Sequence, residues 1–322
     1  MLLLNHSQVQ HILQEAPEIV RPAVVDAYRS FRDGASASAH SFLPIPNEDF
    51  SRFISLPAYL MGERGRVAGA KWVSNFRGNM TRGERPLNTL LLLSDAETGV
   101  PLGCMECTEI NLRRTAASAY LAAESCGFNP QNESLGIVGA GELAEAFCAE
   151  LIHTYGTAQS VTITDIVAGR AEALAASLQK RGINASAGSA EDILRNAGIT
   201  ILATSAAEPW IDIDLLPTDH RLLLHISTDD LPVEYYSRAL NITDSVEGVA
   251  SETDGLGGAI RAGLDRTEVL ELPRIMDGPT VTDERPVVYS PFGLSLLDVA
   301  LAREVHEVAV NKGYGVLWEP RG

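Results

Sequence analysis

Two hydrophobic patterns divide this chain. Up to residue 107 the apolar positions come mostly in short runs bounded by Gly, Pro and charged residues, which is typical of β-strands joined by tight turns. Strands are expected at residues 52–60, 66–74, 87–95 and 100–107. The turns "MGERG" and "AETG" separate the first two and the last two of these strands, so each pair predicts a hairpin.

Helical patterns flank these strands. Residues 8–33 are expected to be helical, with "RPAVVDAYRSF" as an amphipathic segment, and Pro44, Pro46 and Pro57 are expected to break up the stretch that follows. A long helix is expected at 109–127. The first part of the chain therefore predicts a mixed α+β region with an antiparallel sheet.

From residue 134 apolar strands alternate with helices. Strands are expected at 134–141, 160–165, 199–205, 221–227 and 239–245, and helices at 142–156, 168–182, 189–198 and 294–315. This alternation predicts an α/β fold with a Rossmann-type, doubly wound parallel sheet. Since 322 residues suffice for two cores, we expect a mixed domain of residues 1–115 and 293–322 and a Rossmann domain of residues 116–292.

A glycine-rich turn marks the expected cofactor site. Gly139, Gly141 and Ala144 follow an apolar strand and open a helix. Gly139 allows a tight turn, Gly141 lets the backbone approach a pyrophosphate, and Ala144 allows the helix to pack closely against the strand. The helix N-terminus, with Glu142 and Leu143, offers free N–H groups to the phosphates.

An acid at the end of the second strand favours NAD. Asp165 is placed to bind both ribose hydroxyls of NAD and to repel a 2′-phosphate, whereas Arg170 nearby leaves NADP open. A Rossmann domain that has lost its cofactor is the alternative, because fold alone does not fix function. Because a domain precedes the cofactor fingerprint, substrate groups are expected from residues 1–115.

Charge restricts the class of ligand. The formal net charge of −17 argues against nucleic acid or an anionic membrane as partner, and a basic cluster at 71–85, "KWVSNFRGNMTRGER", indicates a small anionic ligand. The N-terminus lacks the features of a signal peptide, and no run reaches the ~20 apolar residues of a membrane-spanning helix, so we expect a cytoplasmic protein. Cys104 and Cys107 lack further ligands at suitable spacing, so no metal site is expected.

Lysine is rare in this chain, which holds 22 Arg and three Lys. Lys180 and Lys312 each precede a glycine in the last turn of an expected helix, where a cation meets the negative end of the dipole. Lys71 lies instead between apolar residues of an expected strand. Because an ammonium exchanges protons and a guanidinium does not, Lys71 is a candidate for chemistry; a packed stem with its head in water is the alternative.

Other polar residues are weaker candidates. Arg52 and Arg114 can each bind a carboxylate through two parallel hydrogen bonds. The alternative for each is an ordinary solvent-exposed arginine. Asp229 and Asp230 follow an expected parallel strand, where they could move protons or simply cap a turn. His225, inside the apolar strand, is interpreted as a core histidine.

Several motifs together resemble the ornithine cyclodeaminase/μ-crystallin family. They are "KW" at 71–72, "LSDAETGVPLGCME" at 93–106, "RRTAASA" at 113–119, "GIVGAGELA" at 136–144 and "SPFGLSLLDVA" at 290–300. Within the family, "KW", "GN" at 78–79 and Glu106 are most similar to the N-(2-amino-2-carboxyethyl)-L-glutamate dehydrogenases, which form 2,3-diaminopropionate in siderophore pathways. The segments 79–88, 252–264 and 276–286 depart from the family pattern.

The resemblance implies a homodimer, NAD and an amino-acid substrate. The family's substrate-gripping lysine falls on Lys71 and its carboxylate-binding arginine on Arg114, while Arg52 matches an arginine of the siderophore branch. The catalytic aspartate falls on Asp230, with adjacent Asp229 as the alternative. Thr204, with Ser205 beside it, is implied near the cofactor.

The expected reaction is oxidation at Cα by NAD+, with Lys71 and Asp230 as the catalytic pair. The imine is then hydrolysed, most simply giving 2,3-diaminopropionate and 2-oxoglutarate. Arg77, Arg82 and Arg85 favour this substrate because it carries several carboxylates. Two alternatives remain: a cyclodeaminase or ketimine reductase that handles a cyclic imino acid, and a non-catalytic, crystallin-like NAD(P)H-binding protein.

Overall fold

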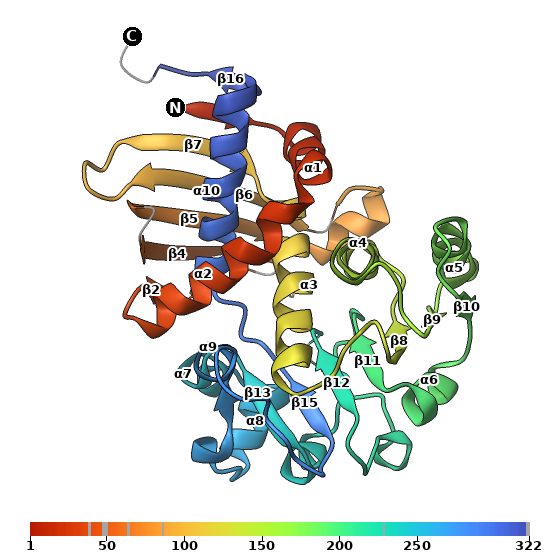
Figure 1. The fold of residues 1–322 in the computed structure, drawn as a ribbon. Helices are drawn as coiled ribbons and strands as arrows, with labels where there is room; N and C mark the ends of the chain where they lie inside the picture. The colour runs from red at the N-terminus through yellow and green to blue at the C-terminus, as the bar shows by residue number, and fades with distance from the viewer. Residues whose placement is uncertain (38–39, 47–50, 63–64, 86, 228, 320–322) are drawn as a thin grey trace. The chain divides into compact units, whose positions relative to one another are not determined.

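A computed structural model describes residues 1–37, 40–46, 51–62, 65–85, 87–227 and 229–319. The chain forms two compact units (Figure 1). Unit 1 consists of Met1–Thr115 with Leu294–Gly322, and unit 2 of Ala116–Gly293. The division falls within one helix, α3 (Thr108–Ser125).

Unit 1 is built on a mixed sheet. Its order among the described residues is β16-β1-β7-β6-β5-β4-β2, with β3 also paired to β4. The strands are β1 (Leu2–Leu4), β2 (Ser36–Ala37), β3 (Ser41–Pro44), β4 (Arg52–Gly62), β5 (Gly65–Asn75), β6 (Leu87–Asp95), β7 (Pro101–Glu106) and β16 (Val316–Leu317). Strands β4 to β7 form an antiparallel meander, seen side by side in Figure 1, and β1 pairs with β7 in parallel. The predicted hairpins and the mixed, mainly antiparallel sheet are confirmed.

The helices of unit 1 are α1 (His6–Glu15), α2 (Val20–Arg32), the first part of α3 and α10 (Ser295–Lys312), with the 3₁₀ segments η1 (Pro17–Ile19) and η2 (Arg77–Arg82). The single helical stretch predicted for 8–33 is wrong in its continuity. Pro17 cannot donate a backbone hydrogen bond to the preceding turn, so α1 ends at Glu15 and a 3₁₀ turn leads into α2.

Pro57 was expected to interrupt regular structure, and this prediction is wrong. It lies inside β4, opposite Ala70 of β5. On the other side of β4, β2 pairs at Ala58 and β3 pairs at Ser55, so neither strand lies opposite Pro57. On that side Pro57 has no partner strand among the described residues, and a strand tolerates proline where no such pairing is needed.

One face of the sheet is covered by α10 and α2. On β5 the buried positions Val67, Lys71 and Val73 alternate with outward-facing ones. Gly69 lies among them because a Cβ there would come within 2.8 Å of Val299 Cγ2 on α10. This close approach of helix and strand places the Lys71 side chain on the buried, helix-covered face.

Unit 2 is a parallel α/β sheet of order β10-β9-β8-β11-β12-β15-β13-β14. Its strands are β8 (Ser134–Val138), β9 (Ser160–Thr164), β10 (Ala185–Ala187), β11 (Ile199–Leu202), β12 (Leu222–His225), β13 (Leu240–Thr243), β14 (Leu270–Glu271) and β15 (Val287–Tyr289). Every described pairing is parallel. The predicted doubly wound α/β fold is confirmed.

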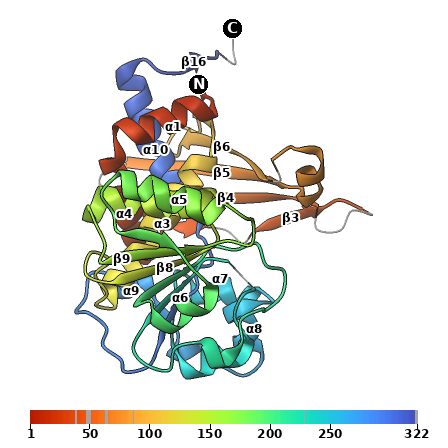
Figure 2. The ribbon, with the colours of Figure 1, turned by 90° about the vertical axis from the view of Figure 1, so that its right-hand side faces the viewer.

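The helices of unit 2 include α4 (Glu142–Tyr155), α5 (Arg170–Lys180) and α6 (Ala190–Asn196), with α5 and α6 on opposite faces of the sheet (Figure 2). Shorter segments follow: η3 (Ile213–Leu215), η4 (Val233–Arg238), α7 (Val246–Ser251), α8 (Gly255–Arg261), η5 (Arg266–Glu268) and α9 (Leu272–Ile275). Strand β15 and these short segments were not predicted, because their apolar runs are too brief to show a period.

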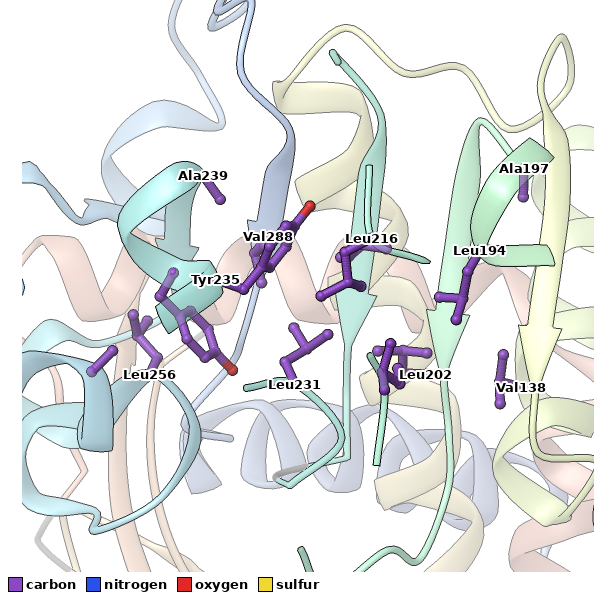
Figure 3. Close-up of a cluster of buried hydrophobic side chains, with 14 of the residues drawn as sticks. Val138, Leu194, Ala197, Leu202, Leu216, Leu231, Tyr235, Ala239, Leu256 and Val288 are labelled. Carbon is purple, nitrogen blue, oxygen red and sulfur yellow. The ribbon is translucent and has the colours of Figure 1, made fainter. Parts of the chain in front are cut away.

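A buried apolar cluster holds the ends of several strands of unit 2 together (Figure 3). It includes Val138 at the end of β8, Leu202 at the end of β11 and Leu231 in the segment after β12. The loops that leave this edge of the sheet are therefore anchored by apolar side chains.

In the part of the chain that is described, no helix is long and apolar enough to cross a membrane.

Candidate active site

The glycine turn of unit 2 has the geometry of a phosphate cradle. Gly139 has φ +99°, and a Cβ there would lie 2.3 Å from the carbonyl oxygen of Ala203, so only glycine fits. A Cβ on Gly141, by contrast, would meet nothing within 4 Å. The backbone at Gly141 thus borders open space, and Ala144, which is fully buried, lets α4 pack tightly.

The N-terminus of α4 is available to an anion. Gly141 is its N-cap residue. A glycine has no side chain to accept a hydrogen bond from the first N–H groups of the helix. Glu142 is exposed and Leu143 half-buried in the first turn. A dinucleotide pyrophosphate fits this arrangement, because the N–H groups of the first turn and the positive end of the helix dipole attract negative charge.

Asp165 follows β9, beside the glycine turn. Its carboxylate accepts hydrogen bonds from the backbone N–H of Ala140 and of Val167, both at 2.7 Å. Arg170 is exposed in the first turn of α5. The acid predicted to bind ribose therefore lies at the cradle itself, and the arginine lies five residues further along the chain.

The segment after β11 borders the same turn. Ala203, whose oxygen limits Gly139, donates its N–H to Val138, and half-buried Thr204 follows directly. Ser205 is exposed. Thr204, Gly139 and Asp165 thus gather at one edge of the sheet, at the carboxyl ends of β11, β8 and β9.

Unit 1 contains a separate candidate site, a buried ionic cluster. Lys71 donates from Nζ to Oδ2 of Asp298 at 2.6 Å and to Oδ1 of Asn111 at 2.9 Å. Arg114 donates from Nε to Oδ1 of Asp298 at 3.2 Å and from Nη2 to Oδ1 of Asn111 at 2.7 Å. The two cations are therefore held side by side, on the same two acceptors.

Burial makes this cluster electrostatically strong. Lys71 is 4% exposed, Arg114 6% and Asp298 0%. Two cations face this one carboxylate, and a buried charge is costly without a counterion. The ammonium group of Lys71 is buried. This excludes the alternative of a lysine with a packed stem and its head in water.

His40 lies beside this cluster. Ala37 pairs with Ala58 and Ser41 with Ser55, so His40 falls close to Leu56, the residue opposite Lys71. Burial lowers the pKa of His40 to about 4, and the positive charges of Lys71 and Arg114 add to this effect. The imidazole is therefore neutral near pH 7.

Asp298, Asn111 and His40 were missed by the sequence analysis. Asp298 is the one acid in "SLLDVALA", an otherwise apolar run at the start of α10, and a charge inside such a run is a sign of a buried partner. Asn111 is three residues before Arg114 on α3, the spacing that places two side chains on one helix face. His40 carries no comparable signal.

The other predicted cations lie elsewhere in unit 1. Arg52 is exposed at the start of β4, with its guanidinium 5.2 Å from the centre of the Phe42 ring. Arg82 and Arg85 are also exposed, and Arg82 donates to Asn79 at 2.8 Å. The structure therefore groups Lys71 with Arg114 and leaves Arg52 outside the cluster; the Arg77 side chain lies outside the described part.

The two candidate aspartates differ sharply in environment. Asp230 is completely buried, whereas Asp229 is half-buried. Burial by itself raises the pKa of Asp230, but hydrogen bonds from His225, Ser227, Thr204 and Trp210 outweigh it and lower the pKa to about 2. His225 is buried as predicted, and its ring is hydrogen-bonded to Tyr236 at 2.9 Å.

The cysteines are all thiols. Cys104 is half-buried on β7 and Cys107 is buried just after it, and burial raises the pKa of the Cys107 thiol. Among the described residues no group of His, Cys, Asp or Glu could hold a metal ion.

Comparison with known proteins shows the family to which this chain belongs. Residues 4–313 match the model of the ornithine cyclodeaminase/mu-crystallin family. A Δ1-pyrroline-2-carboxylate reductase of Bacillus cereus is 27% identical over 98% of both chains. An N-((2S)-2-amino-2-carboxyethyl)-L-glutamate dehydrogenase of Staphylococcus aureus is 23% identical over 98% of this chain and 97% of its own.

A solved structure agrees along the whole chain. An archaeal alanine dehydrogenase dimer with bound NAD superposes with a TM-score of 0.88, at 24% identity and with 99% of each chain covered. At this identity the likeness concerns the fold.

Proposed function

This chain belongs to the ornithine cyclodeaminase/mu-crystallin family, and we propose that it is an NAD-dependent oxidoreductase that interconverts an α-amino acid and its imine. The observation that carries the proposal is the buried cluster of Lys71 and Arg114 on a shared Asp298. Two cations fixed side by side on one carboxylate suit the binding of a substrate carboxylate.

Asp298 and Asn111 act as positioning residues. Each accepts a hydrogen bond from both cations, so the ammonium and the guanidinium are fixed before substrate arrives. Among the described residues, these acceptors use two of the three N–H groups of Lys71, and the third is left for the substrate. A carboxylate bound in this way fixes the orientation of the adjoining Cα–H bond.

The cofactor is proposed to bind at the glycine turn of unit 2. NAD+ supplies the hydride acceptor there, as its chemistry requires. Gly141 and the α4 N-terminus would hold the pyrophosphate and Asp165 the adenosine ribose, because an acid at this place repels a 2′-phosphate. Glu142, Leu143, Thr204 and Ser205 are the further contacts proposed.

The reaction balances with the cofactor and water as the only co-reactants. Cα loses a hydride to the oxidised cofactor and the substrate nitrogen loses a proton to an aspartate, which leaves a C=N bond. Water then adds to the imine and releases a 2-oxo acid and an amine. In the reverse direction, reduction of an imine gives the amino acid.

NADH absorbance tests the proposal. The protein is mixed with NAD+ and a panel of amino acids that includes L-alanine and L-proline, and separately with NADH and Δ1-pyrroline-2-carboxylate. One of these should be turned over, and Lys71→Met should lower kcat/KM by at least about a hundredfold while NADH affinity is kept. NADH binding with no turnover of any α-amino or α-imino acid would point instead to a cofactor-binding protein.

The finer proposal is a substrate with several carboxylates, N-(2-amino-2-carboxyethyl)-L-glutamate. The observation that favours it is the position of three arginines at one end of the sheet. Arg52 starts β4 opposite Asn75, the last residue of β5, and Arg82 and Arg85 lie in the connection from β5 to β6. Cations gathered there suit the outer carboxylates of a long substrate.

Paired variants separate this substrate from a small imino acid. If the finer proposal holds, Arg52→Gln and Arg85→Gln each raise KM for N-(2-amino-2-carboxyethyl)-L-glutamate by about tenfold, with 2-oxoglutarate as product. Turnover of Δ1-pyrroline-2-carboxylate, unaffected by these substitutions, would favour the cyclic imino acid.

A homodimer is also proposed. Trp72, Leu90 and Leu92 point away from α10 and remain 44%, 50% and 42% exposed, and Phe53 stacks on Trp72. A sheet face this apolar is typical of a protein–protein interface. Light scattering should give twice the chain mass, and Leu92→Glu should give a monomer; a monomeric wild-type protein would contradict the proposal.

A further inference from the structure

Unit 1 contains a cavity that the proposed reaction does not use. It has a volume of about 620 Å³ and lies among α2, α10, the end of β4 and the start of β5. Helices α2 and α10 pack on each other and on β4, and both cross the sheet in Figure 1. Pockets that bind small molecules have volumes of roughly 300–1,000 Å³, so this cavity has the size of a ligand site.

A buried arginine lines the cavity from α10. Arg303 is 6% exposed, and its Nε and Nη2 both donate to one oxygen, Oε1 of Glu304, at 3.3 and 3.2 Å. A guanidinium carries five N–H groups, and in the described part of the chain those on Nη1 have no acceptor. The edge formed by Nη1 and Nη2 can therefore bind a carboxylate through two parallel hydrogen bonds.

A second buried contact fixes the wall between α2 and β4. Ser30 donates its hydroxyl to the carbonyl oxygen of Met61 and accepts the N–H of Met61 at 3.1 Å. Ser30 and Leu60, which are both buried, line the cavity beside this contact. The shape of the cavity is therefore set before a ligand arrives, which lowers the entropic cost of binding.

The mouth of the cavity carries charges of both signs. Asp26 and Asp33 line it from α2 and are exposed, as are the lining residues Arg29 and Arg66. Asp33 meets its neighbour Arg32 at 3.4 Å. Asp26 forms no hydrogen bond or ion pair within the described part of the chain, so its carboxylate is open to a cation.

We propose that this cavity binds a small molecule that carries both a carboxylate and an ammonium group, as a free amino acid does. The carboxylate binds Arg303 in the buried part of the cavity, and the ammonium binds Asp26 at the mouth. A simple anion such as inorganic phosphate fits this lining less well, because Asp26 and Asp33 repel it. Charges of both signs around one cavity instead match a zwitterion.

The cavity is separate from the Lys71 cluster. Arg303 and Asp298 lie five residues apart on α10, which is about 7.5 Å along the helix axis and about 140° around it. Their side chains therefore point to different sides of the helix. The cavity also lies on the helix-covered side of the sheet, away from the exposed face of Trp72 that is proposed for the dimer. A ligand in the cavity would thus be additional to the substrate.

Gly62 offers a way to close the cavity. This glycine lines it and follows Leu56, Ala58 and Leu60 on the helix-covered face of β4. A Cβ on Gly62 would meet nothing within 4 Å, and the φ of Gly62 lies outside the left-handed region. Gly62→Leu should therefore fold normally and fill part of the cavity with an apolar side chain.

Calorimetric titration of the full-length protein tests the proposal. The protein is saturated with NADH, so that no amino acid is oxidised, and carries Lys71→Met, so that the substrate cluster is disabled. At least one of the standard L-amino acids should bind with a dissociation constant below about 1 mM. Adding Gly62→Leu should weaken this binding at least about tenfold, whereas Glu18→Gln, which removes an exposed acid outside the cavity, should leave it unchanged.

Asp26→Asn tests the ammonium contact. Because Asp26 is exposed, the substitution should leave the fold intact, and it should weaken binding of the amino acid about tenfold. The N-acetyl derivative of the same amino acid lacks the ammonium, so it should bind weakly to the parent protein and lose nothing further in Asp26→Asn. Equal losses for the two ligands would contradict a contact between Asp26 and the ammonium.

Two further results would overturn the inference. One is that no amino acid binds the Lys71→Met protein, or that Gly62→Leu binds it as tightly as its parent does. The other is that inorganic phosphate binds more tightly than any amino acid, which would identify a site for simple anions. Absence of amino-acid turnover in the wild-type protein would end the proposed function alone, because the titration measures binding at the cavity without any reaction.

Discussion

Lys71 shows how a single residue type carries information in this chain. Buried at 4% exposure and bonded to Asp298 at 2.6 Å, it contributes the smaller and more adaptable of two adjacent cations. Arginine, the usual cation of this protein, would need more room at the same place and could not exchange protons. Lysine here therefore fits a role in binding or chemistry better than a role in stability alone.

The stability of the cluster should depend on its acid. Asp298→Asn removes the carboxylate charge that the two buried cations Lys71 and Arg114 share, so it should lower the free energy of unfolding by about 3 kcal/mol. Lys71→Met leaves the neutral pair of Arg114 and Asp298 and should cost much less. Urea unfolding of the two variants measures the difference, and equal losses would contradict this charge balance.

Asp230 should leave a mark on acid stability. Its folded pKa of about 2 lies below its ordinary value of 3.8, so the folded state binds its proton less readily than the unfolded chain. The stabilisation, about 2 kcal/mol, is present above pH 3.8 and is lost as the pH falls towards 2. Unfolding free energies of Asp230→Asn and wild type should therefore converge over that range.

At the residue scale the sequence predicted individual candidates better than their partners. Lys71 and Arg114 were named from residue type and motif, and they lie on one shared pair of acceptors. Asp298 was missed because it comes 184 positions after Arg114, and a long-range contact leaves no local pattern. Asp229 and Asp230 could not be told apart because their difference is one of burial.

At the element scale the turn between β8 and α4 invites a comparison of its two glycines. Gly139→Ala meets both a positive φ and the Ala203 oxygen at 2.3 Å, so it should lower the melting temperature and weaken NADH binding. Gly141→Ala has a free volume and an ordinary φ of −92°, so it should melt like wild type and lose only NADH affinity. Differential scanning calorimetry with and without NADH tests both, and a destabilised Gly141→Ala would contradict the open cradle.

The elements themselves were predicted where their hydrophobic period is long. The four strands β4 to β7 and the helices α3, α4, α5 and α10 lie close to their expected ranges. The stretch 246–275 was missed because its elements are two to seven residues long, and several of them are held by the core cluster more than by their own pattern. Pro57 was misjudged because strand tolerance depends on the neighbouring strand's register.

At the scale of the whole molecule, net charge opposes the proposed dimer. Each chain carries −17, so two chains repel each other, whereas the exposed apolar face of Trp72, Leu90 and Leu92 attracts. Salt screens the repulsion beyond about 10 Å at 0.1 M and leaves the apolar contact in place. The dissociation constant of the dimer should therefore fall as ionic strength rises.

Sedimentation at several salt concentrations measures this balance. Wild type should shift toward monomer at low ionic strength and toward dimer at high ionic strength, because only the repulsive part of the interaction is screened. Leu92→Glu should stay monomeric throughout, since it adds charge to the centre of the apolar face. If salt instead dissociated the wild-type dimer, attractive ion pairs would hold the interface, and the apolar face of the sheet would not be its main contact.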